Sequence, residues 1–499
     1  MQIRYEKNNN LPPLAWLASV NNGITSVICG RNVECRDSFF VEGAWNGAFS
    51  AGNFLSSDWF CGTGGRLNDN GIVFSTPTHV TSGLFTANCW KRGGVIVSNS
   101  LHLLCAFANY HMDAQYLNYE IDFNTILFGI DQYRKTIRAF NELEDLVEID
   151  ACYYQNIEVN DQGNINIRKK DAVAPFQNFQ DYYYRLCTAI HGLIDNAQDE
   201  KRTVKYEPVS TISKGYDAPC CATIVHKFGC NTAVTFCAEG KYAEDSGIDI
   251  AKGLGYSQII EKNAAAYLER QDLCEAEQIC SGELGSDLCF IAFDDEFRNK
   301  LVFTGDRGDS VWSRENPICN DNFKFDDILS HIGMSERKLW LGYISVPMPL
   351  FGASSWTSIQ KISQSDEMKP WSIGNDYDRP IPRRIIEEAG ISRQMFGTAK
   401  HGAGIILRYD WGRRAKERMS PAAAKSFDEF VRKHKKLHII QLIKYFWNAK
   451  GIYLNRLGIS FPDMTTKTEK SQIANATSAR YLFPWASEII QQRYKRALL

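Results

Sequence analysis

The sequence predicts an α/β protein in two parts: a β-rich N-terminal part, then a parallel sheet with a helical C-terminal end. Up to about residue 190, short apolar runs such as 71–75 and 94–98 are separated by Gly, Asn and Asp, as strands joined by tight turns are. After residue 203, short apolar runs alternate with helical ones, which is typical of a parallel sheet. From about residue 380 the apolar spacing is mostly helical.

The length of 499 residues favours two domains, and we assign them to 1–195 and 203–499, with the junction in the polar segment between. A hydrophobic content of 44% and a charged content of 23% are typical of a globular protein. No apolar run reaches the length of a bilayer span, and the first residues do not resemble a signal peptide. We therefore expect a cytoplasmic protein without a membrane partner.

The 15 cysteines are scattered along the chain, and several lie within apolar runs, as Cys105 does. Without a secretory signal, this usage favours reduced and buried thiols. No CxxC pair occurs, so we expect no structural zinc site.

Charge is distributed unevenly. Residues 379–499 carry 24 Lys and Arg against 9 Asp and Glu, a balance of +15, so the rest of the chain carries −17. The basic part is compatible with a solvated surface, with docking on the acidic part, with lining an ATP and pyrophosphate site, or with binding nucleic acid such as tRNA. The charge distribution alone does not choose among these four interpretations.

A helix is predicted over 179–194, before the junction. The second part is predicted to begin with a strand at 209–212, a helix at 220–228, a strand at 232–237 and a helix at 245–254; Gly229 and Gly255 close the two helices. A further strand begins at Leu301. Parallel strands place ligands at their carboxyl ends, so the residues directly after these strands are the first candidates for a site.

The segment after the first of these strands combines a glycine turn, an acid and a helix start. The backbone N–H groups of such a turn can hold a phosphate, with Gly215 allowing a conformation that other residues resist. Lys214 supplies a positive charge, and Asp217 is suited to Mg²⁺. A plain strand-to-helix turn is the alternative. The candidate nucleotide-binding residues are Ser213, Lys214, Gly215, Tyr216, Asp217 and Ala218.

A second glycine turn, Thr304-Gly305-Asp306-Arg307-Gly308-Asp309, follows the strand that begins at Leu301. Asp217 and Asp309 would lie at the ends of two separate strands. Two carboxylates placed in this way can share one Mg–pyrophosphate unit. This turn adds Gly305, Arg307 and Gly308 to the nucleotide-binding candidates.

The two turns resemble those of a known superfamily. The first resembles the Ser-Gly-Gly-x-Asp-Ser loop of the PP-loop ATP pyrophosphatases, and the second the Ser-Gly-x-Gly-Gly-Asp-Glu turn of asparagine synthetases (the adenine nucleotide alpha-hydrolase-like superfamily). The resemblance implies ATP and Mg²⁺ as ligands, with Asp309 at the metal-binding position. It also implies that a strand passes the adenine at Thr235 and Phe236, and that an Asp opens the next helix. We interpret Asp245 there as a plain N-cap.

A later segment, 367–402, is dense in Arg, Lys and aromatic residues. In asparagine synthetase-like enzymes a comparable segment places an Arg at a helix start and then a Lys near pyrophosphate. By order and residue type, this implies Arg383, Arg384 and Lys400 as catalytic residues. A docking interface rich in Arg and Trp is the competing interpretation.

The whole chain resembles asparagine synthetase B-type proteins in layout: an N-terminal Ntn-amidotransferase-like sandwich followed by a PP-loop (HUP-type) synthetase domain. Their glutaminase nucleophile is an N-terminal Cys, whereas here residue 2 is Gln2 and the first cysteine is Cys29. We therefore expect a degenerate amidotransferase-like domain without glutaminase activity. The turns also depart from the family patterns at Lys214, Ala218 and Arg307, where the families have Gly, Ser and Gly.

The resemblance implies an ATP-dependent, AMP-forming ligase. It would adenylate a small-molecule or peptide carboxylate and form an amide with an amine or ammonia. The first alternative is a PP-loop enzyme that modifies a nucleobase or tRNA, by 7-cyano-7-deazaguanine synthase-like chemistry or by thiolation. The second is a catalytically altered nucleotide-binding protein. The substrates and the oligomeric state stay open.

Overall fold

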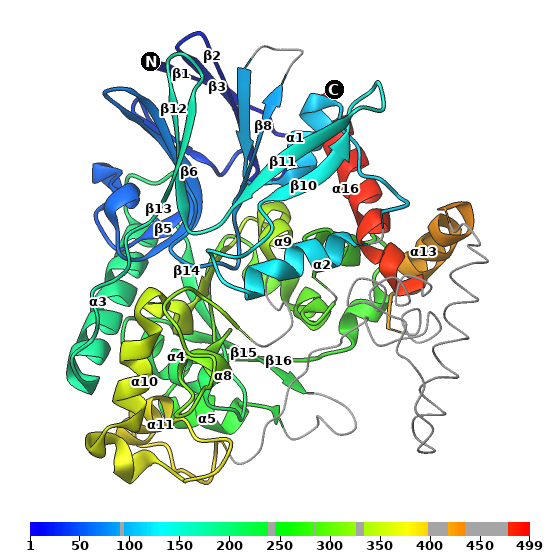
Figure 1. The fold of residues 1–499 in the computed structure, drawn as a ribbon. Coiled ribbons are helices and arrows are strands. Elements are labelled where there is room, and N and C mark those ends of the chain that lie inside the picture. Colours follow the sequence, from blue (N-terminus) through cyan, green and yellow to red (C-terminus); the bar gives the residue numbers. More distant parts are fainter. Residues whose placement is uncertain are drawn as a thin grey trace, which may run out of the picture.

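A computed structural model describes residues 1–89, 94–116, 118–237, 245–283, 285–325, 334–397, 418–434 and 478–499. Two packed sheets form the N-terminal part, drawn in the upper half of Figure 1, and a separate parallel sheet forms the second part below it. The mixed α/β class, with a β-rich N-terminal part and a parallel sheet after it, is therefore confirmed.

The N-terminal part contains two sheets. In spatial order, and within the described residues, the first sheet consists of β1 (Gln2–Lys7), β3 (Ile24–Cys29), β2 (Trp16–Asn21), β9 (Gly94–Ser98), β8 (Leu84–Cys89), β11 (Leu146–Cys152) and β10 (Thr136–Phe140). The second consists of β13 (Ile165–Lys169), β12 (Gln155–Asn160), β7 (Gly71–Ser75), β6 (Phe60–Asn68), β5 (Phe39–Trp45) and β4 (Glu34–Cys35). The strands predicted at 71–75 and 94–98 are confirmed.

The two sheets pack face to face around an apolar core. Trp16 of the first sheet meets Phe40 of the second edge-to-face, with ring centroids 4.9 Å apart, and stacks on Phe74 at 6.1 Å. Alternation along each strand sends such side chains to the inner face, which is how sandwiches build their cores. Helix α1 (Leu101–Ala108) packs on the first sheet, and its N-cap Ser100 accepts the Leu103 N–H at 3.1 Å.

Helix α3 (Phe179–Gln198) packs on the second sheet beside β5. Its N-cap Asn178 accepts the Asp181 N–H at 2.9 Å, which satisfies one of the donors that a helix start leaves unpaired. The helix predicted over 179–194 is confirmed and runs one turn further. Its buried apolar residues recur at helical spacing: Phe179, Tyr182, Leu186, Ala189, Ile190, Leu193, Ile194 and Ala197.

The second part is organised around a parallel sheet whose strand order reverses in the middle. In spatial order its strands are β16 (Gln258–Asn263), β15 (Thr232–Cys237), β14 (Glu207–Thr211), β17 (Lys300–Thr304) and β18 (Ile344–Pro347), and every pairing is parallel. The chain runs outward from β14 to β16 and then returns to the other side of β14 with β17. Doubly wound sheets bind ligands in the crevice at such a reversal, next to the carboxyl ends of the strands.

Helices cover both faces of this sheet. On one face α4 (Asp217–His226) and α5 (Ile248–Leu254) follow β14 and β15. On the other, Val209 and Val302 pack against Phe293 and Phe297, which come from η7 (Leu288–Phe293) and α7 (Asp294–Phe297). These helices begin at other residues than predicted. The helix predicted at 220–228 begins three residues earlier, at Asp217, and the helix predicted at 245–254 begins three residues later, at Ile248.

The C-terminal end is helical within the described residues, with α11 (Pro380–Glu388), α13 (Pro421–His434) and α16 (Leu482–Leu498). Figure 1 shows α16, in red, beside α1 of the N-terminal part. The Gln491 amide donates to the Tyr110 carbonyl, and the Asn8 amide donates to the Ala497 carbonyl at 2.8 Å. The last helix therefore ties the two parts together, and the division at 195 and 203 stays a prediction.

The remaining elements of the described residues are short. The α-helices are α2 (Tyr119–Asn124), α6 (Glu275–Ile279), α8 (Gly308–Val311), α9 (Met334–Leu341) and α10 (Trp356–Gln364). The 3₁₀ turns are η1 (Phe49–Ala51), η2 (Phe54–Ser56), η4 (Thr125–Leu127), η6 (Ala266–Glu269), η8 (Met348–Leu350), η9 (Ala353–Ser355), η10 (Asp366–Trp371) and η12 (Ser478–Tyr481).

The cysteines are free thiols, and most of them are buried, as predicted. Across the described ranges, no helix combines the length and the apolar character that crossing a membrane requires.

Candidate functional site

The two predicted turns meet at the reversal of the sheet, between β14 and β17. A Cβ atom built on Gly308 would lie 2.4 Å from Cγ of Asp217, and one built on Gly305 would lie 2.6 Å from the backbone nitrogen of Ala218. Both distances are far below any real contact, so these two positions exclude a side chain. The turn after β17 is thus seated directly on the first residues of α4, and Asp217 lies against it.

This packing gives a prediction with a matched control. We expect Gly308→Ala to lower the free energy of unfolding by about 1–3 kcal/mol, because the methyl group must displace the Asp217 side chain. Gly215→Ala should change it by less than about 1 kcal/mol, since a Cβ there meets its nearest atoms at 3.4 and 3.5 Å. Urea unfolding of the two variants measures the difference, and equal stabilities would contradict the packing described.

The loop before α4 is half-buried and held by its neighbours. The Lys214 N–H donates to the backbone carbonyl of Asp245 at 3.3 Å, and the Gly215 N–H donates to Oγ of Ser213 at 3.2 Å. The Lys214 carbonyl accepts the Gly397 N–H at 2.7 Å. Gly215 has no positive φ, so the expected need for a special backbone conformation there was wrong. A Cβ atom would also fit there, at 3.4 Å from Oγ of Ser213, so neither the backbone conformation nor the packing requires a glycine at this position.

Tyr216 is the buried anchor of this loop. Its ring is fully covered, and a Cβ on Gly397 would lie only 2.3 Å from it. Its hydroxyl accepts a hydrogen bond from Nη2 of Arg383, and its ring centroid lies 4.9 Å from that of Tyr377. Burial raises the pKa of the Tyr216 phenol, while the Arg383 charge opposes the shift. Tyr216 therefore positions the turn, and Arg383 acts through it.

Arg379 links the two turns, and sequence analysis missed it. Its Nε lies 3.8 Å from Oδ1 of Asp217, and its Nη2 donates to the Asp309 carbonyl at 3.2 Å. The residue is 5% exposed, and its guanidinium lies 4.6 Å from the Tyr377 ring centroid. Burial disfavours the charged form of Arg379 and so lowers its pKa. The nearby Asp217, Tyr377 and Asp309 raise the pKa by more, so that it lies above its usual value. Its position in the sequence could have indicated Arg379, because it is an Arg directly before the Pro that opens α11.

Arg383 and Arg384 are neighbours in α11 but serve different surroundings. Arg384 lies 3.9 Å over the Phe179 ring of α3 and 4.5 Å from the Trp371 ring. It also forms ion pairs with Glu367 at 2.7 Å and Glu388 at 2.8 Å. The structure therefore joins Arg383 to the loop and Arg384 to the helix α3. Lys400 lies outside the described residues.

Arg307 adopts the left-handed conformation, with φ of 66°. This region is uncommon for a residue with a side chain. Its guanidinium lies 4.9 Å from the Phe325 ring centroid and its Nε lies 4.0 Å from Oδ1 of Asp306. At 5% exposure, Arg307 is a buried part of this turn.

The side chains of Thr235 and Phe236, on β15, make contacts within the protein. Oγ1 of Thr235 accepts the Gly247 N–H at 2.9 Å, and the Phe236 ring packs 4.8 Å from Phe293 and 5.3 Å from Phe290. Asp245 was expected to be an N-cap, but Gly247 occupies the N-cap of α5. Asp245 instead accepts the Lys214 N–H, because the loop after β15 lies against the loop after β14.

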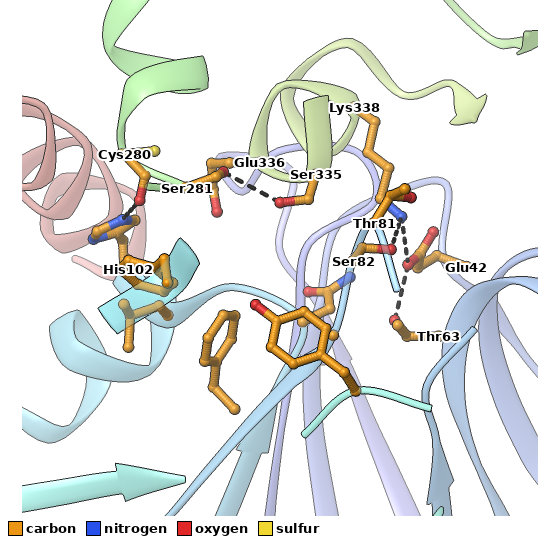
Figure 2. Close-up of a pocket in the computed structure, with 16 residues that line it drawn as sticks. Glu42, Thr63, Thr81, Ser82, His102, Cys280, Ser281, Ser335, Glu336 and Lys338 are labelled. Atoms are coloured by element: carbon orange, nitrogen blue, oxygen red, sulfur yellow. Dashed lines mark hydrogen bonds and ion pairs between the residues drawn. The ribbon is translucent and has the colours of Figure 1, made fainter. Parts of the chain in front are cut away.

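A small cavity lies between the two parts of the chain, and Figure 2 shows its lining. Oε1 of Glu42, from β5, lies 3.7 Å from Nζ of Lys338, from α9, and accepts the Thr63 hydroxyl at 2.8 Å. Oε2 of Glu42 makes no hydrogen bond within the described residues. Burial raises the pKa of Glu42, and Lys338 opposes that shift. The volume of about 20 Å³ suits one or two water molecules.

Glu336 at the edge of this cavity gives a pH dependence. Burial raises its pKa to about 7, and the carboxylate accepts the Tyr494 hydroxyl at 2.5 Å, joining α9 to α16. A folded pKa above the unfolded value contributes stability that is complete below about pH 4.5 and is lost as the pH rises through about 7. We expect Glu336→Gln to flatten the stability profile between these pH values. An unchanged slope in urea unfolding would contradict this.

A metal ion at the two turns would have Asp217 and Asp309 as its carboxylate ligands. Within the part of the chain that the structure describes, no group of three or more His, Cys, Asp or Glu side chains could hold a metal ion. Asp217 and Asp309 supply carboxylate oxygens, the ligand type that Mg²⁺ prefers. Because Mg²⁺ is commonly held by one or two carboxylates together with substrate phosphates, this pair fits a magnesium–nucleotide better than a bare ion.

Comparison with known proteins adds no assignment. The chain matches no protein-family model, and a search of curated proteins finds no match.

Proposed function

We propose that the protein is an ATP-dependent, AMP-forming ligase of the PP-loop, asparagine synthetase-like superfamily, with ATP and Mg²⁺ as its ligands. It would adenylate a carboxylate and join it to an amine or ammonia. One observation carries the proposal: the glycine turns after β14 and β17 meet at the reversal of a doubly wound sheet, and Arg379 contacts the acidic residue of each.

The residues at the turns have the chemistry that a nucleotide triphosphate requires. The N-terminus of α4 carries a partial positive charge and donors without intrahelical partners, which favour a phosphate. Asp217 and Asp309 would hold Mg²⁺, and Lys214 would add a positive charge at the half-buried loop. Arg307 belongs less to this set than expected, because its guanidinium packs on Phe325.

In the proposed reaction, a carboxylate oxygen of the substrate attacks the α-phosphorus and pyrophosphate leaves. The amine then attacks the acyl carbon, loses a proton, and displaces AMP. Arg379 and Lys214 would offset the charge that develops on the departing pyrophosphate. The N-terminal sandwich fits a degenerate amidotransferase-like domain in this scheme, and Lys400 keeps its predicted role near pyrophosphate.

A nucleotide-binding protein without turnover is the second candidate. It is favoured by the pairing of Asp217 with Arg379, and by the hydrogen bonds that the Lys214 and Gly215 N–H groups already make within the protein. This ion pair and these hydrogen bonds would have to rearrange before the loop could bind a magnesium–triphosphate. The tRNA-modifying alternative stays a prediction, since most of the basic segment 379–499 lies outside the described residues.

Pyrophosphate release from Mg-ATP, measured over a panel of carboxylates with an amine, tests the proposal. We expect Asp217→Asn and Asp309→Asn each to reduce release by about 100-fold, because the metal would lose a charged ligand. Asp249→Asn, which changes an exposed acid in the first turn of α5, is the matched control. Full activity in both site variants would overturn the proposal. Tight ATP binding without release would favour the second candidate.

A further inference from the structure

Cys29 and Cys35 bring two sulfur atoms together across the two sheets of the sandwich. Cys29 ends β3 in the first sheet, and Cys35 ends β4 in the second. Their Sγ atoms lie 3.7 Å apart, in hydrogen-bond contact. Because a disulfide bond measures about 2.05 Å, small side-chain rotations separate this contact from a covalent link.

The surroundings favour the thiolate form of one of the two cysteines, Cys35. Lys7 of β1 directs its ammonium group at the loop between the cysteines, donating to the Gly30 carbonyl at 3.3 Å and to the Val33 carbonyl. The Cys29 thiol and the Lys7 charge lower the pKa of Cys35, although burial and the Glu34 carboxylate oppose this. Cys35 is half-buried, whereas Cys29 is fully buried.

We propose that Cys29 and Cys35 form a reversible dithiol–disulfide site that reacts with hydroperoxides. A partly exposed thiolate next to a positive charge, with a second thiol in contact, is the arrangement of a redox-sensitive cysteine and its resolving partner. The half-buried position makes Cys35 the attacking thiolate, and the buried Cys29 the resolving thiol.

The chemistry is a two-electron oxidation. The Cys35 thiolate attacks the terminal oxygen of the hydroperoxide, the O–O bond breaks, and the alkoxide leaves as an alcohol after taking up a proton. The resulting Cys35 sulfenic acid is attacked by the Cys29 sulfur, which loses its proton while hydroxide leaves as water. Two thiols and one hydroperoxide give one disulfide, one alcohol and one water; a small dithiol reverses the change.

The loop between the cysteines lies at the junction of the two parts of the chain. The Asn32 amide donates to Oδ1 of Asn299 at 2.8 Å, one residue before β17. The Glu34 carboxylate accepts the Thr203 N–H at 2.7 Å, four residues before β14. Oxidation would therefore link the two sheets at the place where the loop contacts the segments leading into the site strands.

The test uses the reduced full-length protein and hydrogen peroxide, followed by alkylation of remaining thiols and peptide mass spectrometry. We expect a Cys29–Cys35 disulfide, seen as a loss of two hydrogens and reversed by dithiothreitol. Cys35 should oxidise about tenfold faster than Cys237, the exposed control at the end of β15. An equal rate at Cys35 and Cys237, or no disulfide, would overturn the proposal.

Two variants separate the roles of the thiols. Cys29→Ser should leave a sulfenic acid at Cys35 that dimedone traps, whereas Cys35→Ser should leave Cys29 unmodified. Lys7→Met should slow oxidation of Cys35, and Lys7→Arg should restore it, which loss of packing alone would not do. Circular dichroism checks that each variant is folded. Dimedone labelling of Cys29 in Cys35→Ser at the wild-type rate would contradict the assignment of roles.

Discussion

Replacing Arg379 by Met is expected to abolish most nucleotide binding and to lower the free energy of unfolding by about 1–3 kcal/mol. Arg379 is the buried cation between Asp217 and Asp309, and its loss removes the ion pair that it makes with the Asp217 carboxylate. Arg379→Lys should recover part of the stability but little of the binding, because an ammonium cannot span both turns as a guanidinium fork does.

Calorimetric titration with Mg-ATP and urea unfolding measure the two effects separately. Arg384→Met is the matched control from the same segment, since Arg384 contacts Phe179, Glu367 and Glu388 and neither turn. It should leave ATP affinity unchanged. If Arg379→Met retained both affinity and stability, Arg379 would have no role in joining the turns.

Replacing Lys338 by Met is expected to cost about 3–5 kcal/mol of unfolding free energy. Glu42 is 1% exposed, and Lys338 is the cation in contact with it across the boundary between the two parts. Removing one partner of a buried pair leaves the other charge desolvated and uncompensated. The expected damage is therefore larger than for an ion pair at the surface.

The double variant Glu42→Gln, Lys338→Met distinguishes this explanation from lost packing. Without a buried charge it should recover most of the stability, as judged by the midpoint and slope of urea unfolding. Lys369→Met is the control, since Lys369 pairs with Asp366 on the surface and should change stability by less than about 1 kcal/mol. A double variant as unstable as Lys338→Met would refute the charge explanation.

The local pattern was sufficient to predict the strand–turn–helix units of the second part. Thr232–Cys237 forms the predicted strand because its β-branched and apolar residues lie between polar turns. Gly305 and Gly308 marked a turn, and the structure shows that close approach to α4 requires them. The special backbone conformation predicted for Gly215 is absent, because a single sequence does not distinguish a glycine that needs a positive φ from one that does not.

The cations of the site were harder to predict. Order and residue type predict the same role for Arg383 and Arg384. Successive residues of a helix point about 100° apart, however, so Arg383 reaches Tyr216 and Arg384 reaches α3. Arg379 contacts Asp217 across more than 160 residues of sequence. No local periodicity encodes such a pairing.

Local sequence patterns suffice to predict the α/β class, the parallel sheet and the two glycine turns, because these depend on propensities and periodicities within a few residues. The packing of distant segments, by contrast, brings the two turns together between β14 and β17, joins them through Arg379, and returns α16 to pack on α1. It also brought Cys29 and Cys35 into contact across two sheets. These contacts arise from burial and close packing of distant segments, which are properties of the whole folded chain.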